Sequence, residues 1–312
     1  MSNSLHEITQ HILNLFAARE SADMPLFVAL QGPQGSGKSY LTGLTKAALS
    51  SAPHSLRVVT ASLDDFYLPH HGLVTLASEH PSNPLWRGRG QPGTHDIPLA
   101  ITVLKALKEN QPADVEIPVF EKSLHGGEGD RLPMTGNTAR TPADVVILEG
   151  WCTGFCPISE SELNKRWDGA WQDQKTALGL SDSIVGSKKS LEDVNAALYS
   201  YLEVWSYFDA FVQIAPSLVQ DATDATSPYS VIYKWRLEQE HAMKLQNGGL
   251  GMSDDAVKLF VDRYIPGYVF FGDGVSSGYQ DRDGVWRSPP WEGKGLRISI
   301  NEGRELVSVE HM

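Results

Sequence analysis

Eight residues decide how this chain is organised: Gly32-Pro33-Gln34-Gly35-Ser36-Gly37-Lys38-Ser39. They match the pattern G-x-x-x-x-G-K-S/T of a phosphate-binding loop. An apolar run long enough for one buried strand, Leu26–Leu30, comes just before them, and Tyr40–Leu49 follows with apolar residues at helical spacing. The motif therefore lies between a strand and a helix, and this context favours nucleotide binding over a chance glycine-rich turn.

Each residue type in this loop has a physical role in binding phosphate. Glycines allow a backbone that turns its N–H groups inward as an anion nest, and the helix then begins with the positive end of its dipole at the same point. Lys38 adds a mobile charge for the β- and γ-phosphates, and Ser39 offers a hydroxyl to Mg²⁺. We therefore expect ATP and Mg²⁺ as cofactors. The residues expected to hold them are Gly32, Pro33, Gln34, Gly35, Ser36, Gly37, Lys38, Ser39 and Tyr40.

Composition narrows the class of protein. The 312 residues suffice for one large α/β domain with insertions, or for two small ones, and 41% of them are hydrophobic, which supports a sizeable core. A net charge of −12 without a run of Lys and Arg argues against a nucleic-acid partner. No apolar stretch is long enough for a membrane span, and the N-terminus lacks a secretory signal core. Cys152 and Cys156 are too few for a disulfide framework and lack zinc-ligand spacing, so we expect a cytoplasmic protein with reduced thiols.

Strand-like and helix-like segments alternate along the rest of the chain. Strands are expected at Leu56–Leu63, Val115–Phe120, Val145–Leu148, Ala210–Ile214 and Leu296–Ile300. Helices are expected at residues 1–22, 97–107, 191–206, 231–245 and 253–264, with Thr94 or Asp96 capping the second of them. Residues 69–96 and 121–141 are expected as long loops, and residues 153–190 as an insertion. The alternation predicts a parallel sheet covered on both faces, with ligands beyond the carboxyl ends of its strands.

Three carboxylates follow the predicted strands. Glu149 ends an all-apolar strand, where a carboxylate can hold Mg²⁺ directly or through water, or can simply cap the next turn. We therefore expect Ser39 and Glu149 as the metal ligands. Asp64 and Asp65 end the predicted strand Leu56–Leu63, which should lie near the phosphate loop, and either could accept the proton of an attacking hydroxyl. Neighbouring residues point in different directions, so we expect one base; alternatively, both only terminate the strand in a turn.

A charged helix later in the chain could move during the reaction. Lys234 and Arg236 lie near its start, among few apolar neighbours. These cations could close over the phosphates as a lid. The alternative is that this charged face is only solvated.

These segments together resemble a known group of enzymes. Leu63-Asp64-Asp65-Phe66-Tyr67-Leu68 resembles the D-x-F-Y signature of the uridine kinase, pantothenate kinase and phosphoribulokinase class of P-loop kinases. The chain is more similar to the D-glycerate 3-kinases of plants and their fungal relatives. The resembling stretches, in order, are residues 62–68, 87–96, 120–123, 129–131, 148–151, 233–240 and 260–266. Glu121 departs from the family pattern, which has Asp, and residues 271–295 match nothing in it.

The resemblance implies a P-loop kinase fold with a five-stranded parallel core. It implies that Asp64 aligns with the catalytic aspartate, that Arg236 belongs to the lid, and that residues 87–96 form an acceptor-side loop. The catalytic residues are then expected to be Lys38, Asp64 and Arg236. The acceptor side is expected to include Asp65, Tyr67, Arg87, Arg89, His95, Lys122 and Arg131.

Three functions are compatible with this sequence: a kinase for glycerate, a kinase of the same fold for another alcohol such as a nucleoside or pantothenate, and a non-catalytic ATP-binding switch. A switch needs neither an acceptor-side loop nor an aspartate near the γ-phosphate, so both features favour an enzyme. The two loops carry four cations but only one nearby aromatic residue, Trp86, which favours an acid over a nucleoside. We expect a kinase that phosphorylates a small hydroxy acid, D-glycerate at its 3-hydroxyl.

Overall fold

A six-stranded sheet forms the centre of the computed structural model, which describes residues 2–19, 21, 23–217, 227–246 and 248–312. The strand order is β12-β11-β8-β1-β7-β2. Five strands are parallel, and β12 pairs antiparallel with β11 at one edge. The bounds are β1 Leu26–Gln31, β2 Val58–Ser62, β7 Val145–Gly150, β8 Ala210–Pro216, β11 Gly295–Ile300 and β12 Leu306–His311. The expected five-stranded parallel core is confirmed, with β12 as an addition.

The topology places the carboxyl end of β1 at the centre of one edge of the sheet. From β1 the chain goes to one side for β2 and β7, and then to the other side for β8 and β11. Every residue of β1 and β7 is buried, which explains why both strands read as continuous apolar runs. Ligands of such sheets bind in the crevice where the strand order reverses, beyond the carboxyl ends.

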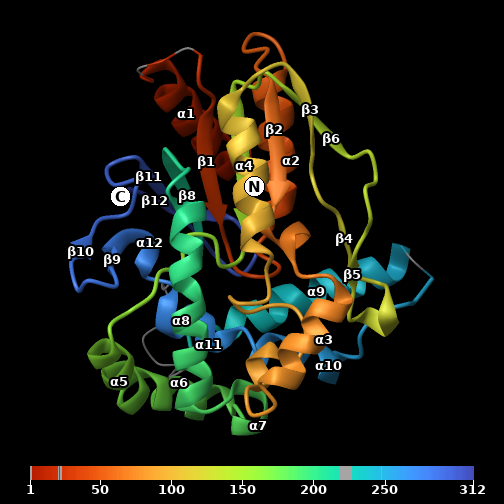
Figure 1. Ribbon diagram of the computed structural model, residues 1–312, viewed down its shortest axis with the longest axis vertical. Helices are drawn as coiled ribbons and strands as arrows, with labels where there is room; N and C mark the ends of the chain where they lie inside the picture. Colours follow the sequence, from red (N-terminus) through yellow and green to blue (C-terminus); the bar gives the residue numbers. More distant parts are fainter. Residues whose placement is uncertain (1, 20, 22, 218–226, 247) are drawn as a thin grey trace.

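Helices cover both faces of the sheet (Figure 1). α1 (Ser2–Ala17) and α2 (Lys38–Ser50) pack on one face, and α4 (Ile97–Glu109) and α8 (Lys188–Trp205) pack on the other. The Asp96 side chain accepts from the backbone N–H of Leu99, so Asp96 caps α4 as one of the two predicted caps. The expected first helix ends at Ala17, and residues 20 and 22 of its range lie outside the described residues.

Many helical segments, most of them short, gather beyond the carboxyl ends of the strands, at the bottom of Figure 1. They are η1 Leu63–Phe66, α3 His70–Glu79, η2 Pro84–Trp86, α5 Glu160–Asp168, α6 Ala170–Leu178, α7 Asp182–Val185, α9 Ser230–Gln246, α10 Asp254–Asp262 and α11 Ile265–Phe271. Residues 271–295, which matched no family pattern, contain α12 Gly274–Ser277 and a hairpin of β9 Tyr279–Gln280 and β10 Trp286–Arg287. No helix among the described residues is long and apolar enough to cross a membrane.

Two expectations about local structure are only partly right. The strand expected at Val115–Phe120 is divided between two short strands: β3 (Ala113–Glu116) pairs antiparallel with β6 (Thr138–Thr141) outside the main sheet, and only Val115 of β3 is buried. Next to this ribbon, β4 (Phe120–Glu121) pairs with β5 (Asp130–Arg131), and η3 (His125–Gly127) lies between them. The region 69–96 is not entirely irregular either, because it contains α3. Leu73 is the one buried residue of α3, so its apolar spacing is too weak to reveal a helix.

Candidate active site at the carboxyl edge of the sheet

The phosphate loop follows β1 and leads into α2. Gly35 and Gly37 have φ angles of 75° and 91°, a backbone region that favours glycine, and Gly37 is the N-cap of α2. Space also requires glycine at position 35, where a Cβ atom would lie 2.5 Å from the carbonyl carbon of Trp235. The loop therefore has the backbone of an anion nest, placed at the positive end of a helix.

Lys38, Ser39 and Glu149 meet where the phosphate loop passes the end of β7. Ser39 Oγ donates to Glu149 Oε1 at 2.7 Å, and Lys38 Nζ lies 3.9 Å from Glu149 Oε2. Glu149 is 6% exposed, and its Oε2 has no hydrogen-bond partner among the described residues. A hydroxyl beside a buried carboxylate with one unpaired oxygen is a donor set that fits Mg²⁺. The described residues contain no group of three acidic, His or Cys side chains placed to hold a metal, and Mg²⁺ at kinase sites needs none, because it takes waters and phosphate oxygens.

Asp64 lies in η1, directly after β2. Its Oδ2 accepts from Lys122 Nζ at 2.6 Å, while its Oδ1 is buried without a hydrogen-bond partner among the described residues. Burial by itself would raise the pKa of Asp64, but the charges of Lys122 and Lys38 lower it well below its ordinary value. The carboxylate is therefore ionised at neutral pH, with one oxygen free to accept a hydrogen bond.

Asp65 makes different contacts, as expected for a neighbouring residue. Its Oδ1 accepts from the backbone N–H of Phe120 at 3.1 Å, at the start of β4. Burial raises the pKa of Asp65 to about 6; the hydrogen bond from Phe120 opposes this rise, and the charge of Asp64 adds to it. Asp65 thus holds the backbone of the segment that carries Lys122.

The structure brings two of the four expected acceptor-side cations together. Asp64 raises the pKa of Lys122, and the nearby charge of Arg89 lowers it. Arg89 also donates to the carbonyl of Gly127 at 2.7 Å and to that of Glu128, so it links its own loop to η3. The other two make separate contacts: Arg131 donates to Asp96 Oδ2 at 2.8 Å, and exposed Arg87 donates to the carbonyl of Pro81 at 3.3 Å.

Tyr67, after η1, and His95, in the acceptor-side loop, lie side by side in the interior. Their side chains are buried, and their rings stack with centroids 4.3 Å apart. His95 Nδ1 shares a hydrogen bond of 2.7 Å with the hydroxyl of Tyr201, and burial lowers the pKa of His95 to about 4. His95 is therefore neutral at physiological pH. The Nε2 of His95 has no hydrogen-bond partner among the described residues, and the charge of Asp64 acts on both side chains.

Arg263 and Tyr264, at the corner between α10 and α11, also lie near this site, although neither is among the residues expected there. Burial and the charge of Asp64 raise the pKa of Tyr264, whereas Arg263, Arg89 and Lys122 lower it. Arg263 donates to the carbonyl of Arg87 at 2.5 Å and has no acidic partner among the described residues. The two residues stand in a stretch that resembles the kinase family, and this resemblance is the signal that could have identified them.

Arg236 does not extend over the phosphate loop in this structure. Its Nη2 lies 2.7 Å from Glu240 Oε2, one turn further along α9, and its guanidinium lies over the ring of Phe260. The preceding residue, Trp235, is in contact with Gly35. α9 therefore begins beside the phosphate loop, and the predicted closure of Arg236 would require it to leave Glu240.

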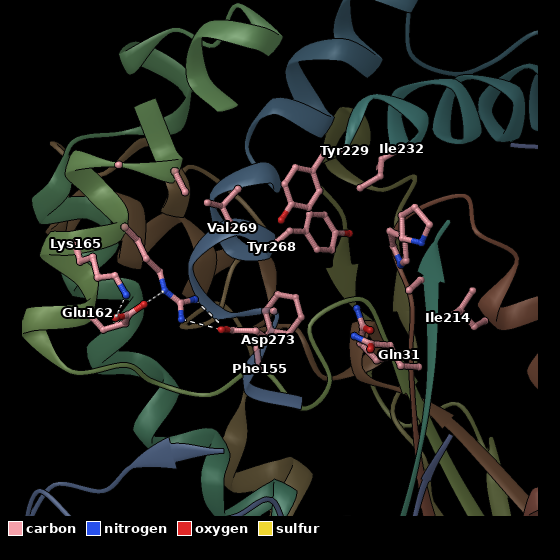
Figure 2. A pocket seen from close by; sticks show the side chains of 18 residues that line it. Gln31, Phe155, Glu162, Lys165, Ile214, Tyr229, Ile232, Tyr268, Val269 and Asp273 are labelled. Atoms are coloured by element: carbon pink, nitrogen blue, oxygen red, sulfur yellow. Dashed lines mark hydrogen bonds and ion pairs between the residues drawn. The ribbon is translucent and has the colours of Figure 1, made fainter. Parts of the chain in front are cut away.

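A separate cavity of about 600 Å³ lies between the ends of β1 and β8 and helices α5, α6 and α11 (Figure 2). Phe155, Tyr229 and Tyr268 line it, together with Gln31. Lys38, Asp64 and Glu149 are not among its lining residues, so it is not the phosphate site. It borders the phosphate loop, however, because Pro33 is one of its lining residues, and the hydroxyl of Tyr268 donates to the side chain of Gln34.

The chain is similar to kinases over most of its length, although no family model matches it. It is 36% identical over 273 residues to an uncharacterized kinase of Schizosaccharomyces pombe, and the aligned region covers 86% of this chain and 89% of that protein. It is 32% identical over 267 residues to the chloroplastic D-glycerate 3-kinase of Arabidopsis thaliana, and here the aligned region covers 83% of this chain and 51% of that protein.

The structure also matches a solved one. The D-glycerate 3-kinase from Cryptococcus neoformans superposes with a TM-score of 0.83 at 37% sequence identity, over 99% of each chain. The likeness therefore extends beyond the phosphate loop to nearly the whole of both proteins.

Proposed function

This chain belongs to the D-glycerate 3-kinase family of P-loop kinases, and from that premise we propose that it transfers the γ-phosphate of Mg·ATP to the 3-hydroxyl of D-glycerate. The chain is an ATP-dependent kinase of small molecules, with an alcohol group as the acceptor. The observation that carries the proposal is the ionised Asp64, held by Lys122 within the electrostatic reach of Lys38.

The proposed reaction divides the work among these side chains. The nest and Lys38 bind the β- and γ-phosphates, and Ser39 and Glu149 hold Mg²⁺, which offsets the charge of the phosphate oxygens when bound. Asp64 accepts a hydrogen bond from the acceptor hydroxyl on its free Oδ1 and orients that oxygen toward the γ-phosphorus. As the new O–P bond forms and the bond to ADP breaks, the hydroxyl proton passes to Asp64.

The cations around Tyr264 support an acid as the acceptor. A carboxylate taken from water requires charge-assisted donors, and the planar fork of arginine matches its two oxygens. Arg263 has a guanidinium without an acidic partner among the described residues, and Lys122 and Arg89 lie nearby. We therefore assign the carboxylate to Arg263 and Lys122. Arg131, which pairs with Asp96, is a weaker candidate than its sequence position suggested.

A panel of alcohols tests this proposal by coupled release of ADP. D-glycerate should be the best acceptor, and glycerol and glyceramide should be far poorer, by up to roughly 10⁴-fold, because they leave the guanidinium of Arg263 without an acidic partner. Arg263→Gln should lower kcat/KM for D-glycerate much more than for glycerol, whereas Arg131→Gln should change both by a similar factor. Phosphorylation of glycerol as efficient as that of D-glycerate would contradict the proposal. Preference for a nucleoside or pantothenate would assign another acceptor.

A further inference from the structure

The turn that joins β11 to β12 reaches back to the phosphate loop. Arg304 in this turn donates from Nε to the carbonyl oxygen of Gly35 at 2.7 Å. The same guanidinium donates from Nη1 to Glu238 Oε2 at 2.7 Å and from Nη2 to the carbonyl oxygen of Trp235 at 3.3 Å. One side chain from near the end of the chain therefore joins the phosphate loop to α9.

The backbone of Arg304 is unusual. Its φ angle is 62°, in the left-handed region that favours glycine. The turn is closed by Asn301, whose carbonyl accepts from the Arg304 N–H at 2.8 Å and whose side chain accepts from the Glu305 N–H at 2.9 Å. An arginine at this position strains a turn that glycine would fit without strain. Residues in such conformations cluster at functional sites, so the contacts of this guanidinium need a reason.

The bond to Gly35 fixes one peptide unit of the nest. The Gly35 carbonyl and the Ser36 N–H belong to the same planar peptide unit and point in opposite directions. A carbonyl held toward Arg304 therefore also fixes the direction of the N–H, away from Arg304. In this structure the Ser36 N–H donates to the carbonyl of Pro33 at 3.2 Å, and this bond closes the turn of residues 33–36. If the unit turned over, the negative end of its dipole would face the phosphates. Glycine at position 35 opposes such a turn less than any other residue.

We propose that Arg304 is a positioning residue, which keeps the phosphate loop in its binding conformation and ties that loop to α9. Trp235 supports the same junction: its Nε1 donates to the carbonyl of Glu302 at 2.7 Å, and its backbone is in contact with Gly35. The apparent affinity for a ligand falls in proportion to the population of the conformer that can bind it. Loss of the Arg304 side chain should therefore weaken the binding of Mg·ATP and leave the KM for the acceptor alcohol unchanged.

Arg304→Gly is the decisive variant, because it removes the side chain and also relieves the backbone strain. A loss of function in this variant cannot then be attributed to a destabilised turn. Arg304→Lys is the rescue variant, since lysine can still donate one hydrogen bond to the Gly35 carbonyl. Arg297→Ala is the matched control: Arg297 lies in β11 of the same hairpin and donates to Gln213 Oε1 at 2.6 Å. Its other polar partners among the described residues are Ser276 and Glu310, and neither belongs to the phosphate loop or α9.

Calorimetric titration with Mg·ATP, without any acceptor, tests the proposal independently of the acceptor's identity. Arg304→Gly should raise the Kd about tenfold or more, as expected if the competent conformer falls to a tenth of its population. Arg304→Lys should lie between this variant and the wild type, and Arg297→Ala should match the wild type. A folded Arg304→Gly protein with the wild-type Kd would overturn the proposal, and so would equal losses in Arg304→Gly and Arg297→Ala.

Discussion

Asp64 and Asp65 are neighbours in the chain, yet their carboxyl groups have opposite electrostatic surroundings. Lys122 and Lys38 surround Asp64 with positive charge, and they outweigh the effect of its burial. Asp65 is half-buried and has one backbone N–H as its partner. The same residue type therefore pairs with a lysine side chain at one position and with a backbone N–H at the next.

Catalysis should depend on Asp64 rather than on Asp65. Asp64→Asn removes the proton acceptor but keeps the shape of the side chain, so kcat should fall by about 10²–10⁴ while Mg·ATP still binds. Asp65→Asn keeps an oxygen for the Phe120 N–H and should lower kcat much less. Steady-state kinetics of the two variants decide the assignment. A larger loss of kcat in Asp65→Asn would reverse it.

Asp65 should reduce the stability of the folded protein at neutral pH. Its pKa is about 6 in the folded protein against an ordinary value of 3.8, so the folded state binds more protons than the unfolded state between these values. Ionised Asp65 therefore destabilises the fold above pH 6, and this penalty disappears as the pH falls towards 3.8. Asp65→Asn should be more stable than the wild type at pH 7.5, by up to roughly 3 kcal/mol.

Urea unfolding at pH 7.5 and at pH 4 measures this difference, with the wild type as the control at each pH. The advantage of Asp65→Asn should shrink at pH 4, where the wild-type carboxyl is mostly protonated in the folded state. A variant that is less stable than the wild type at pH 7.5 would show that the charge of Asp65 is favourable, through a contact such as Lys122.

At the scale of elements, the phosphate loop and α2 contain two glycines with different requirements. A Cβ atom at Gly35 would collide with the backbone of Trp235, whereas Gly43 is exposed in α2 with nothing within 4 Å of an added Cβ. Gly35→Ala should therefore lower both the melting temperature and the affinity for Mg·ATP. Gly43→Ala should raise the stability by about 0.5–1 kcal/mol, from helix propensity alone, and leave the affinity unchanged.

Thermal unfolding and ATP titration of these two variants form a matched pair, because both add one methyl group to the same loop–helix unit. If Gly35→Ala bound Mg·ATP like the wild type, the backbone of α9 at Trp235 would have to move away from the added methyl group at little cost in free energy. That outcome would contradict a close junction between the phosphate loop and α9.

The α9 helix is expected to act in turnover through Arg236. Simple removal of Arg236 would leave Glu240 as a buried unpaired charge, so the variant to use is the double change Arg236→Gln with Glu240→Gln. A lid arginine contacts the transferring phosphoryl group mainly in the closed state, so kcat should fall more than the affinity for ATP. Glu240→Gln alone is the control. A weaker Kd for ATP at unchanged kcat would make Arg236 a binding residue only.

Elements with a local pattern could be predicted from the sequence, and others could not. The apolar run Val145–Leu148 identifies β7 without any knowledge of its neighbours, and the motif at residues 32–39 identifies the phosphate loop. α3 buries only Leu73 and leaves no such pattern. The ribbon of β3 and β6 is held by pairing between distant segments, which a single stretch of sequence does not encode.

At the scale of the whole molecule, the site is assembled from segments that lie far apart in the chain. Lys122 and Asp64 are 58 positions apart, Ser39 and Glu149 are 110 apart, and Arg304 and Gly35 are 269 apart. The parallel sheet explains why the strand-end residues converge, and the sequence could predict that much. The conformation of the loops decides which cation pairs with which carboxylate. Only the folded structure could therefore show that Arg131 pairs with Asp96, whereas Arg263 has no acidic partner among the described residues.

The convergence of these segments predicts how the whole protein responds to its nucleotide. The Oε2 of Glu149 and the Oγ of Ser36 are buried without hydrogen-bond partners among the described residues, so the folded state is left with unpaired polar groups that a ligand can satisfy. A ligand that binds only the folded state stabilises it by about 2.7 kcal/mol at a hundred times its Kd. For a chain of this size the melting temperature should rise by roughly 4 °C with Mg·ATP.

The role of Glu149 can be separated within the same measurement. ATP with EDTA should stabilise the wild type less than Mg·ATP does, because the carboxylate then lies near the phosphates without a metal between them. In Glu149→Gln this charge repulsion is absent and the metal ligand is weaker, so Mg·ATP and ATP with EDTA should give similar shifts. If the wild type itself showed equal shifts with and without Mg²⁺, Glu149 and Ser39 would not form a metal site, and the Ser39–Glu149 hydrogen bond would serve only to hold the start of α2 against β7.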